Sequence, residues 1–260
     1  GQSSVSANGL LSLFANYKKG ENTWSNNLDL AYGVIRQGEN KNWWKNDDRI
    51  QVTSKYGRKA FKNFYYSGLL DFKTQFAPGY NYPNDSVVIS KFLAPAYGLA
   101  ALGMDYKPND NFSIFLAPIS AKVTIVNDQK LADAGAFGVD KALYGTLANG
   151  QYGLVAHGLK HREEVGGYFK MQYRQKVMDN VNFETMLELF SNYLENPGNI
   201  DVNWTTLTSM KVNKYISATF STHLIYDDDI ILERGGSKKG TFGPDVQFKQ
   251  VLSVGLSYKF

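Results

Sequence analysis

Charged residues of opposite sign flank a predicted turn at Asp179, at spacings that would bring them into contact. In an antiparallel hairpin, residues equally distant from the turn face one another. Lys170 then lies opposite Glu188, and Arg174 lies opposite Glu184 in the same way. Such pairs attract by about 0.2–1 kcal/mol each, either as a brace within the fold or as a charged constriction that filters solutes. The predicted polar network also includes Asp71, Lys73 and His223.

Two clusters contain metal-binding residue types, but their spacing argues against a metal site. His157 and His161 would suit a zinc pair only on a helix, which Gly158 weakens, and no third ligand is evident. The consecutive aspartates at 227–229 could bind calcium. Consecutive strand residues point to alternate faces, however, so the three carboxylates would not converge. We therefore expect no metal and no cofactor.

Ser221 and His223 share one face of a predicted strand, and together they provide a nucleophile and a base. Side chains two apart on a strand are separated by about 6–7 Å, so hydrogen-bond contact would need favourable rotamers. A lipid-modifying barrel enzyme is therefore only the third hypothesis. We predict that the protein is not an enzyme and has no catalytic residue.

The elements that carry these residues are predicted to be long β-strands. Apolar and polar residues alternate, as from Val181 to Tyr193, over spans of about 11–14 residues that suit tilted transmembrane strands. In the sixth span the apolar phase shifts at Pro118, which predicts a β-bulge. The eleven predicted spans are residues 5–17, 24–36, 48–58, 63–76, 92–107, 111–126, 164–177, 181–194, 200–213, 215–228 and 247–260.

Short turns alternate with mostly longer connections at 37–47, 77–91, 127–163, 195–199 and 229–246. Outer-membrane barrels have this layout, with short periplasmic turns and long outside loops. The predicted fold class is all-β, a transmembrane antiparallel up-and-down β-barrel that forms a single domain over residues 1–260. Bacterial single-chain barrels have an even number of strands. A twelfth strand is therefore expected upstream of Gly1 or from a partner, unless one span is miscounted.

The outside connections and the last strand supply the remaining candidate residues. The final span ends on Leu256, Tyr258 and Phe260, which resembles the carboxy-terminal assembly signal of outer-membrane barrels, although an ordinary final strand is the alternative. Trp43 and Trp44 are expected in an outside loop, either touching lipopolysaccharide or sugar or anchoring at the membrane boundary.

The connection at 127–163 contains six glycines and is expected to be an irregular extracellular loop. Three alternatives remain for this connection: a plug folded into the mouth of the barrel, an outside docking surface, or a mobile loop. Its aromatic residues, Phe137 among them as a contact candidate, indicate that part of it is packed.

Composition excludes several classes of protein. A net charge of +4 without a basic cluster argues against nucleic-acid binding, and the absence of cysteine excludes a disulfide-stapled fold. The uncharged run from Phe92 to Met104 is too short for a transmembrane helix, which needs about 20 residues. The chain begins without a charged and apolar leader, so a signal peptide is expected to have been removed.

Several strings resemble an uncharacterised, domain-of-unknown-function family of outer-membrane β-barrels from Bacteroidota-type bacteria. The strings are FKTQFAPGYN (72–81), YKPNDNFS (106–113), LADAGAFGVD (131–140), NYLENPGNIDVNW (192–204) and THLIYDDDI (222–230). The resemblance runs from about Gly9 to Ile230. It implies an outer-membrane location, and it assigns no catalytic residue.

Two functions are favoured on this basis. The first is a non-enzymatic structural or accessory subunit of an outer-membrane complex, and the alternative is a narrow passive channel for small solutes. The expected partners are outer-membrane lipids, lipopolysaccharide, the barrel-assembly machinery during biogenesis and other outer-membrane proteins, with no nucleic acid.

Overall fold

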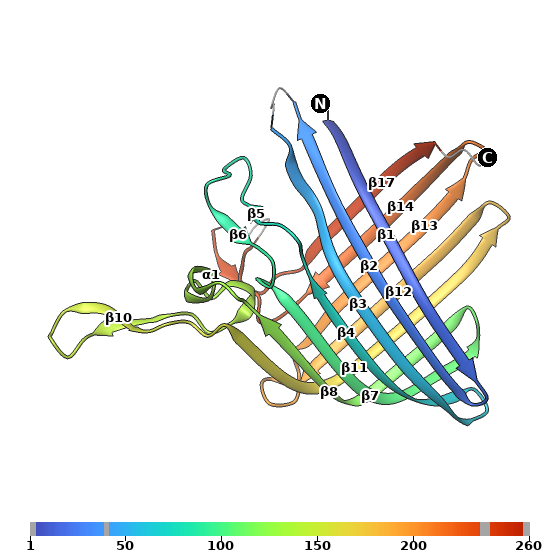
Figure 1. Cartoon of the computed structure of the whole chain (residues 1–260), viewed down its shortest axis with the longest axis horizontal. Helices are drawn as coiled ribbons and strands as arrows, with labels where there is room; N and C mark the ends of the chain where they lie inside the picture. Colours follow the sequence, from blue (N-terminus) through green and yellow to red (C-terminus); the bar gives the residue numbers. More distant parts are fainter. Residues whose placement is uncertain (1–3, 39–41, 235–239, 257–260) are drawn as a thin grey trace. The chain divides into compact units, whose positions relative to one another are not determined.

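The protein is almost entirely antiparallel β-structure. The computed structural model describes residues 4–38, 42–234 and 240–256, and Figure 1 shows their arrangement along the chain. Eleven strands form one sheet in the order β1-β2-β3-β4-β7-β8-β11-β12-β13-β14-β17, so neighbours in the sheet follow one another in sequence. Their bounds are β1 Ser4–Lys19, β2 Asn22–Gln37, β3 Trp44–Phe61, β4 Phe64–Thr74, β7 Ala96–Asn109, β8 Phe112–Ile125, β11 His161–Met178, β12 Val181–Asn192, β13 Ile200–Lys211, β14 Ile216–Tyr226 and β17 Gln247–Leu256.

Each predicted span corresponds to one of these strands, because period-two alternation fixes which residues face each side of a sheet. Several boundaries differ from the prediction by a few residues. The third strand begins at Trp44, so this residue lies on a strand and not in a loop. The fifth begins at Ala96, because Lys91 and Ala94 bridge each other in the preceding turn.

The long connections contain small elements of their own, so the prediction that 127–163 is irregular was wrong. It contains the helix α1 and a hairpin of two strands, and Figure 1 shows β10 in an arm that extends away from α1. Short strand pairs also occupy the connections after β4 and β14. The bounds of these elements are β5 Gly79–Tyr80, β6 Val88–Ser90, α1 Gln129–Asp133, the 3-10 helix η1 Ala136–Gly138, β9 Leu143–Thr146, β10 Tyr152–Ala156, β15 Leu232–Glu233 and β16 Phe242–Gly243.

The chain divides into two compact units. Unit 1 comprises residues 1–56, 68–100 and 121–164, and unit 2 comprises 57–67, 101–120 and 165–260. Among the described residues, no helix is long and apolar enough to cross a membrane.

At several strand positions, the burial of apolar and polar residues is the reverse of that in a soluble sheet. On β4, Tyr66 and Leu70 are each 61% exposed, whereas Ser67 is 6% exposed. On β8, Leu116 is 58% and Ile119 65% exposed, whereas Ser120 is 2% exposed. Water-soluble folds bury their large apolar side chains, and contiguous exposed apolar surface marks contact with a membrane or a partner.

The predicted irregularity of β8 is visible in the same pattern. Ala117 and Ser120 are buried, while Pro118 and Ile119 between them are both exposed. Two consecutive outward residues mean that the alternation changes phase at this point, as the proline predicted.

Candidate functional site

The charged pairs of unit 2 lie where the turn at Asp179 predicts them. In the register of β11 with β12, Lys170 faces Glu188 and Arg174 faces Glu184. Lys170 Nζ lies 2.9 Å from Glu188 Oε1, and Arg174 Nε lies 3.3 Å from Glu184 Oε2. The turn pairs Met178 with Val181, and a register shift between Lys176 and Met178 then brings residues equally distant from Asp179 opposite one another.

The two pairs differ in their surroundings. The side chains of Lys170 and Glu188 are 19% and 21% exposed, compared with 67% and 47% for Arg174 and Glu184. Glu188 also accepts hydrogen bonds from the Tyr168 hydroxyl (2.6 Å) and from Asn203 Nδ2 (2.9 Å). The inner pair is therefore part of a network, whereas the outer pair is an exposed ion pair of small energetic value.

The network continues to His223. Its Nε2 lies 2.7 Å from Asn203 Oδ1. Because Asn203 donates its amide to Glu188, its oxygen accepts from His223, and Nε2 must carry the proton. The resulting polar ladder (Tyr168, Lys170, Glu188, Asn203 and His223) crosses four neighbouring strands, β11 to β14. Sequence reasoning missed Tyr168 and Asn203, which have no charge to indicate them.

Aromatic side chains are buried beside the ladder. Phe115, Tyr168 and Phe190 are 1%, 6% and 5% exposed. The rings of Phe115 and Tyr168 meet edge-on, with centroids 6.2 Å apart. Phe190 directly faces Tyr168 across the strand pair. This polar face is consequently packed in part by aromatic rings, and Tyr168 and Phe190 stand at positions that period-two alternation assigns to that face.

Asp71 and Lys73 belong to unit 1 and not to this ladder. The carboxylate of Asp71 accepts hydrogen bonds from Thr53 Oγ1 (2.5 Å) and from Gln51 Nε2 (3.0 Å). Lys73 has a polar or electrostatic contact of its own. The seven predicted network residues therefore do not make one site. In unit 2, Lys170, Glu188 and His223 belong to the polar ladder, whereas Arg174 and Glu184 form the separate exposed pair.

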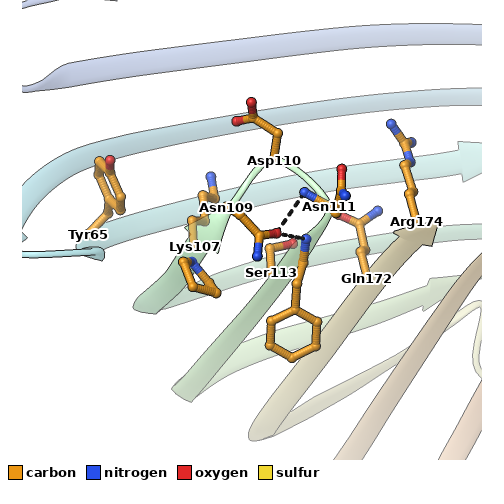
Figure 2. A pocket seen from close by; sticks show the side chains of 10 residues that line it. Tyr65, Lys107, Asn109, Asp110, Asn111, Ser113, Gln172 and Arg174 are labelled. Atoms are coloured by element: carbon orange, nitrogen blue, oxygen red, sulfur yellow. Dashed lines mark hydrogen bonds between the residues drawn. The ribbon is translucent and has the colours of Figure 1, made fainter. Parts of the chain in front are cut away.

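A polar cavity of about 430 Å³ lies at the turn between β7 and β8 (Figure 2). Asn109 Oδ1 closes the turn by accepting from the backbone N–H groups of Asn111 and Phe112, each at 2.9 Å. Lys107 and Arg174 line the cavity. The ammonium group of Lys107 is paired with the carboxylate of Asp105, and the guanidinium group of Arg174 is paired with that of Glu184. The cavity therefore offers hydrogen-bonding groups, while its two cationic side chains are already paired. Its lining residues are Tyr65, Lys107, Pro108, Asn109, Asp110, Asn111, Phe112, Ser113, Gln172 and Arg174.

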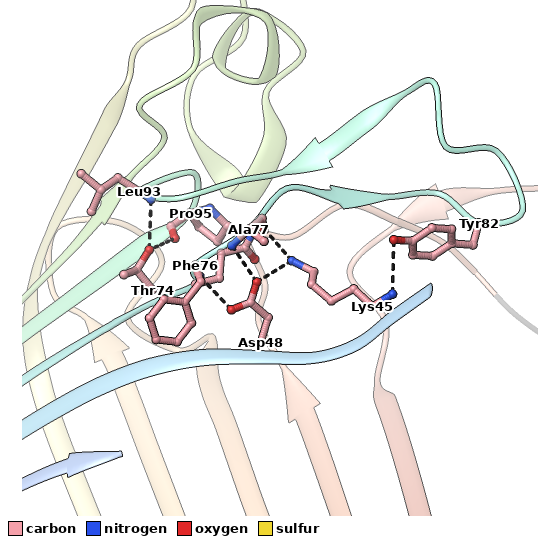
Figure 3. A network of polar contacts seen from close by, with 9 residues as sticks. Lys45, Asp48, Thr74, Phe76, Ala77, Tyr82, Leu93 and Pro95 are labelled. Atoms are coloured by element: carbon pink, nitrogen blue, oxygen red, sulfur yellow. Dashed lines mark hydrogen bonds and ion pairs between the residues drawn. The ribbon is translucent and has the colours of Figure 1, made fainter. Parts of the chain in front are cut away.

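In unit 1, a clamp ties the connection after β4 to the start of β3 (Figure 3). Asp48 accepts hydrogen bonds from the backbone N–H groups of Phe76 (2.7 Å) and Ala77 (2.9 Å). Lys45 Nζ reaches both Asp48 Oδ2 (2.7 Å) and the carbonyl oxygen of Ala77 (2.6 Å). Asp48 is 3% exposed and Lys45 12% in their side chains, so this pair is shielded from water.

The same clamp positions an aromatic group. The rings of Trp44 and Tyr82 are stacked, with centroids 5.4 Å apart and planes inclined by 19°. The ring centroids of Tyr80 and Tyr82 are 6.1 Å apart, and Trp43, which precedes Trp44 in the chain, is 49% exposed. One member of the predicted tryptophan pair, Trp44, thus stacks on a tyrosine from another segment.

The base of the 127–163 connection is folded around two aspartates. Asp128 caps α1 by accepting from the Leu131 N–H at 3.0 Å, and it forms an ion pair with Lys91.

Asp133 accepts from Gln129 Nε2 (2.8 Å) and from the Gly158 N–H (2.8 Å). His157 Nδ1 lies 3.0 Å from the same carboxylate. Hydrogen bonds from Gln129 and Gly158, together with the His157 ring, lower the pKa of Asp133 despite partial desolvation.

Phe137, the predicted contact residue of this connection, packs inward. It lies with Leu131 against a small buried cluster. The cluster consists of Ala94, Val126, Ala132 and Val139.

The other predicted candidates form hydrogen bonds with residues of the connections, pair within the sheet, or lie outside the described residues. Asp228 accepts from Asn199 Nδ2 at 2.6 Å, and Asp227 accepts from the Asp229 N–H at 3.0 Å. In the described part of the chain, no group of three or more His, Asp or Glu residues is placed to hold a metal. Tyr258 and Phe260 lie outside the described residues, and Leu256 ends β17 opposite Ile216.

A pH prediction follows from Asp133. Because its folded-state pKa is lowered, its contacts stabilise the connection above the ordinary value of 3.8. That stabilisation is lost as the pH falls through the lower, folded-state pKa. The hydrogen-exchange protection factors of the 129–158 segment should fall in strong acid, and Asp133→Asn should show the reduced protection already at neutral pH. Equal exchange in the two proteins at neutral pH would contradict this role.

Comparisons with known proteins give two matches. A solved structure described as "NanC porin structure in rhombohedral crystal form" resembles this chain with a TM-score of 0.36 and 7% identity, over 95% of this chain and 99% of that one. At that TM-score, the likeness carries no argument about fold or function. No relative was found among curated proteins. Residues 1–80 match the family described as "Protein of unknown function (DUF3078)", which fits the resemblance to an uncharacterised family that the sequence indicated.

Proposed function

We propose that this chain is an outer-membrane β-barrel that acts as a non-enzymatic structural or accessory subunit. One observation carries the membrane assignment: many large apolar side chains of the strands, such as Tyr66, Leu70, Leu116 and Ile119, are exposed, while small and polar residues on the same strands are buried. Lipid contact makes that pattern favourable, since transmembrane strands alternate apolar residues outward with polar residues inward. Outer-membrane lipids and lipopolysaccharide are the immediate partners in this proposal, and the barrel-assembly machinery acts during biogenesis.

Folded connections support an accessory role. The segments after β4 and β8 carry their own strands, and the second also has a helix and a buried cluster. A loop that is fixed by buried hydrogen bonds presents a defined surface to other proteins at a lower entropic cost than a mobile one. The polar ladder is then a brace within the sheet.

A narrow channel is the second candidate. The observation that favours it is the charged polar face, on which Lys170 and Glu188 are paired but still one-fifth exposed. Charged groups that line a water-filled lumen select solutes.

Planar-bilayer recording separates the two functions. The accessory role predicts no stepwise current from the purified chain, nor from a variant in which a short Gly-Ser link replaces residues 143–156. Discrete current steps in either protein would support the channel and contradict the accessory role. A Lys170→Gln change should alter the ion selectivity of those steps if the charged face lines the pore.

A further inference from the structure

We propose that an aromatic platform, defined as Trp44, Tyr80 and Tyr82, binds a saccharide ring. The platform joins the start of β3 to the segment around β5. Trp44 and Tyr82 stack at 5.4 Å, and Tyr80 meets Tyr82 at 6.1 Å with an inclination of 56°. Aromatic faces carry negative charge density that attracts the polarised C–H groups on one face of a pyranose.

The platform is pre-organised by the clamp in Figure 3. The Lys45 N–H donates to the Tyr82 hydroxyl at 3.3 Å, while its ammonium holds Ala77 O and Asp48. Asp48 in turn fixes the backbone of the segment that leads to the two tyrosines. A site held in its bound geometry loses less conformational entropy when a ligand arrives.

The groups around the platform favour a sugar over a phosphate. The ammonium of Lys45 is already bound within the clamp. Asn81, Asn84 and Asp85 are exposed on the same connection. Their amide and carboxylate groups can donate to or accept from hydroxyl groups, which is the chemistry of a hydroxyl-rich ligand.

The arrangement also differs from simple membrane anchoring. Interfacial tryptophans and tyrosines sit at the headgroup level with an apolar body and a polar tip. Here two rings from separate segments stack face to face, and one hydroxyl accepts a backbone hydrogen bond. The sugar could belong to lipopolysaccharide or to a free oligosaccharide, and the first source rests on the outer-membrane location proposed above.

Tryptophan fluorescence can test this site directly. The chain has four tryptophans, so Trp24→Phe with Trp204→Phe leaves Trp43 and Trp44 as the emitters. This protein, folded in detergent, is titrated with three probes: the lipid-free core oligosaccharide of lipopolysaccharide, a neutral malto-oligosaccharide, and lipid A. Saturable change with either oligosaccharide supports the site, and the responding probe identifies the source of the sugar.

Variants locate the binding. Tyr82→Ala should weaken oligosaccharide binding by roughly tenfold, the effect of losing one aromatic partner. Asp48→Asn should weaken it by a smaller factor, because the clamp positions the rings without touching the ligand. Tyr144→Ala, on the β9–β10 arm, is the matched control and should leave the affinity unchanged, and circular dichroism checks that each variant is folded.

Three results would overturn the proposal: no saturable response to either oligosaccharide, a response to lipid A alone, or an affinity unchanged by Tyr82→Ala. A detergent titration does not depend on location. Failure here would therefore leave the outer-membrane assignment standing, and membrane fractionation tests that assignment separately.

Discussion

Replacing Leu70 by arginine should destabilise the protein by about 2–4 kcal/mol in a lipid bilayer, the cost of a cationic side chain at the lipid-facing middle of a transmembrane strand. Leu70 lies near the centre of β4 and is 61% exposed. In a water-soluble sheet, the same exposed position would tolerate arginine within about 0.5 kcal/mol. Urea unfolding of the protein in lipid vesicles measures the difference.

Tyr152→Arg provides the matched control. Tyr152 is 77% exposed, but it lies on the β9–β10 arm, outside the strands of the main sheet. Its replacement should change the free energy of unfolding by no more than about 0.5 kcal/mol. Equal, small effects at both positions would remove the support for lipid contact along β4.

The second large effect is expected at Glu188. Glu188→Gln removes the charge that Lys170 faces at 2.9 Å, while three donors still converge on the site. Breaking a buried pair by removing one partner costs about 3–5 kcal/mol. Because this pair is about one-fifth exposed, the expected loss is smaller, roughly 2–3 kcal/mol.

Glu184→Gln is the internal comparison, since Glu184 occupies the equivalent register position opposite Arg174 in the same hairpin. Both side chains there are largely exposed, so the loss should stay below about 1 kcal/mol. The free energies of unfolding of the two variants measure whether the loss of stability at Glu188 exceeds that at Glu184. A ladder that braces the sheet requires the Glu188 variant to be clearly the less stable of the two.

Much of this architecture was predictable because two short-range rules apply. Strict alternation assigns each residue of a strand to one face, and a tight turn sets the register of the strands that it joins. The positions of all eleven strands followed from the first rule, and the pairing of Lys170 with Glu188 followed from both. The phase change at Pro118 could be predicted in the same way, because a proline cannot donate a backbone hydrogen bond to the neighbouring strand.

Other features depended on residues far apart in sequence. Asn203 and Tyr168 join the ladder only because β11, β12 and β13 are neighbours in the sheet. The clamp of Asp48 on Phe76 and Ala77 joins two segments whose sequences carry no signal for each other. Phe137 was a contact candidate in a connection expected to be packed in part, and it packs on a cluster that joins Ala94 to the stretch from Val126 to Val139.

The sequence alone therefore determined the strand pattern and the polarity of each face, because both come from a two-residue period. Tertiary structure decided which polar side chains share hydrogen bonds, how the long connections fold, and where the aromatic rings meet. Those outcomes depend on long-range neighbours. They are selective because an unpaired polar group away from water costs about 1–3 kcal/mol, which favours arrangements that give buried polar groups a partner.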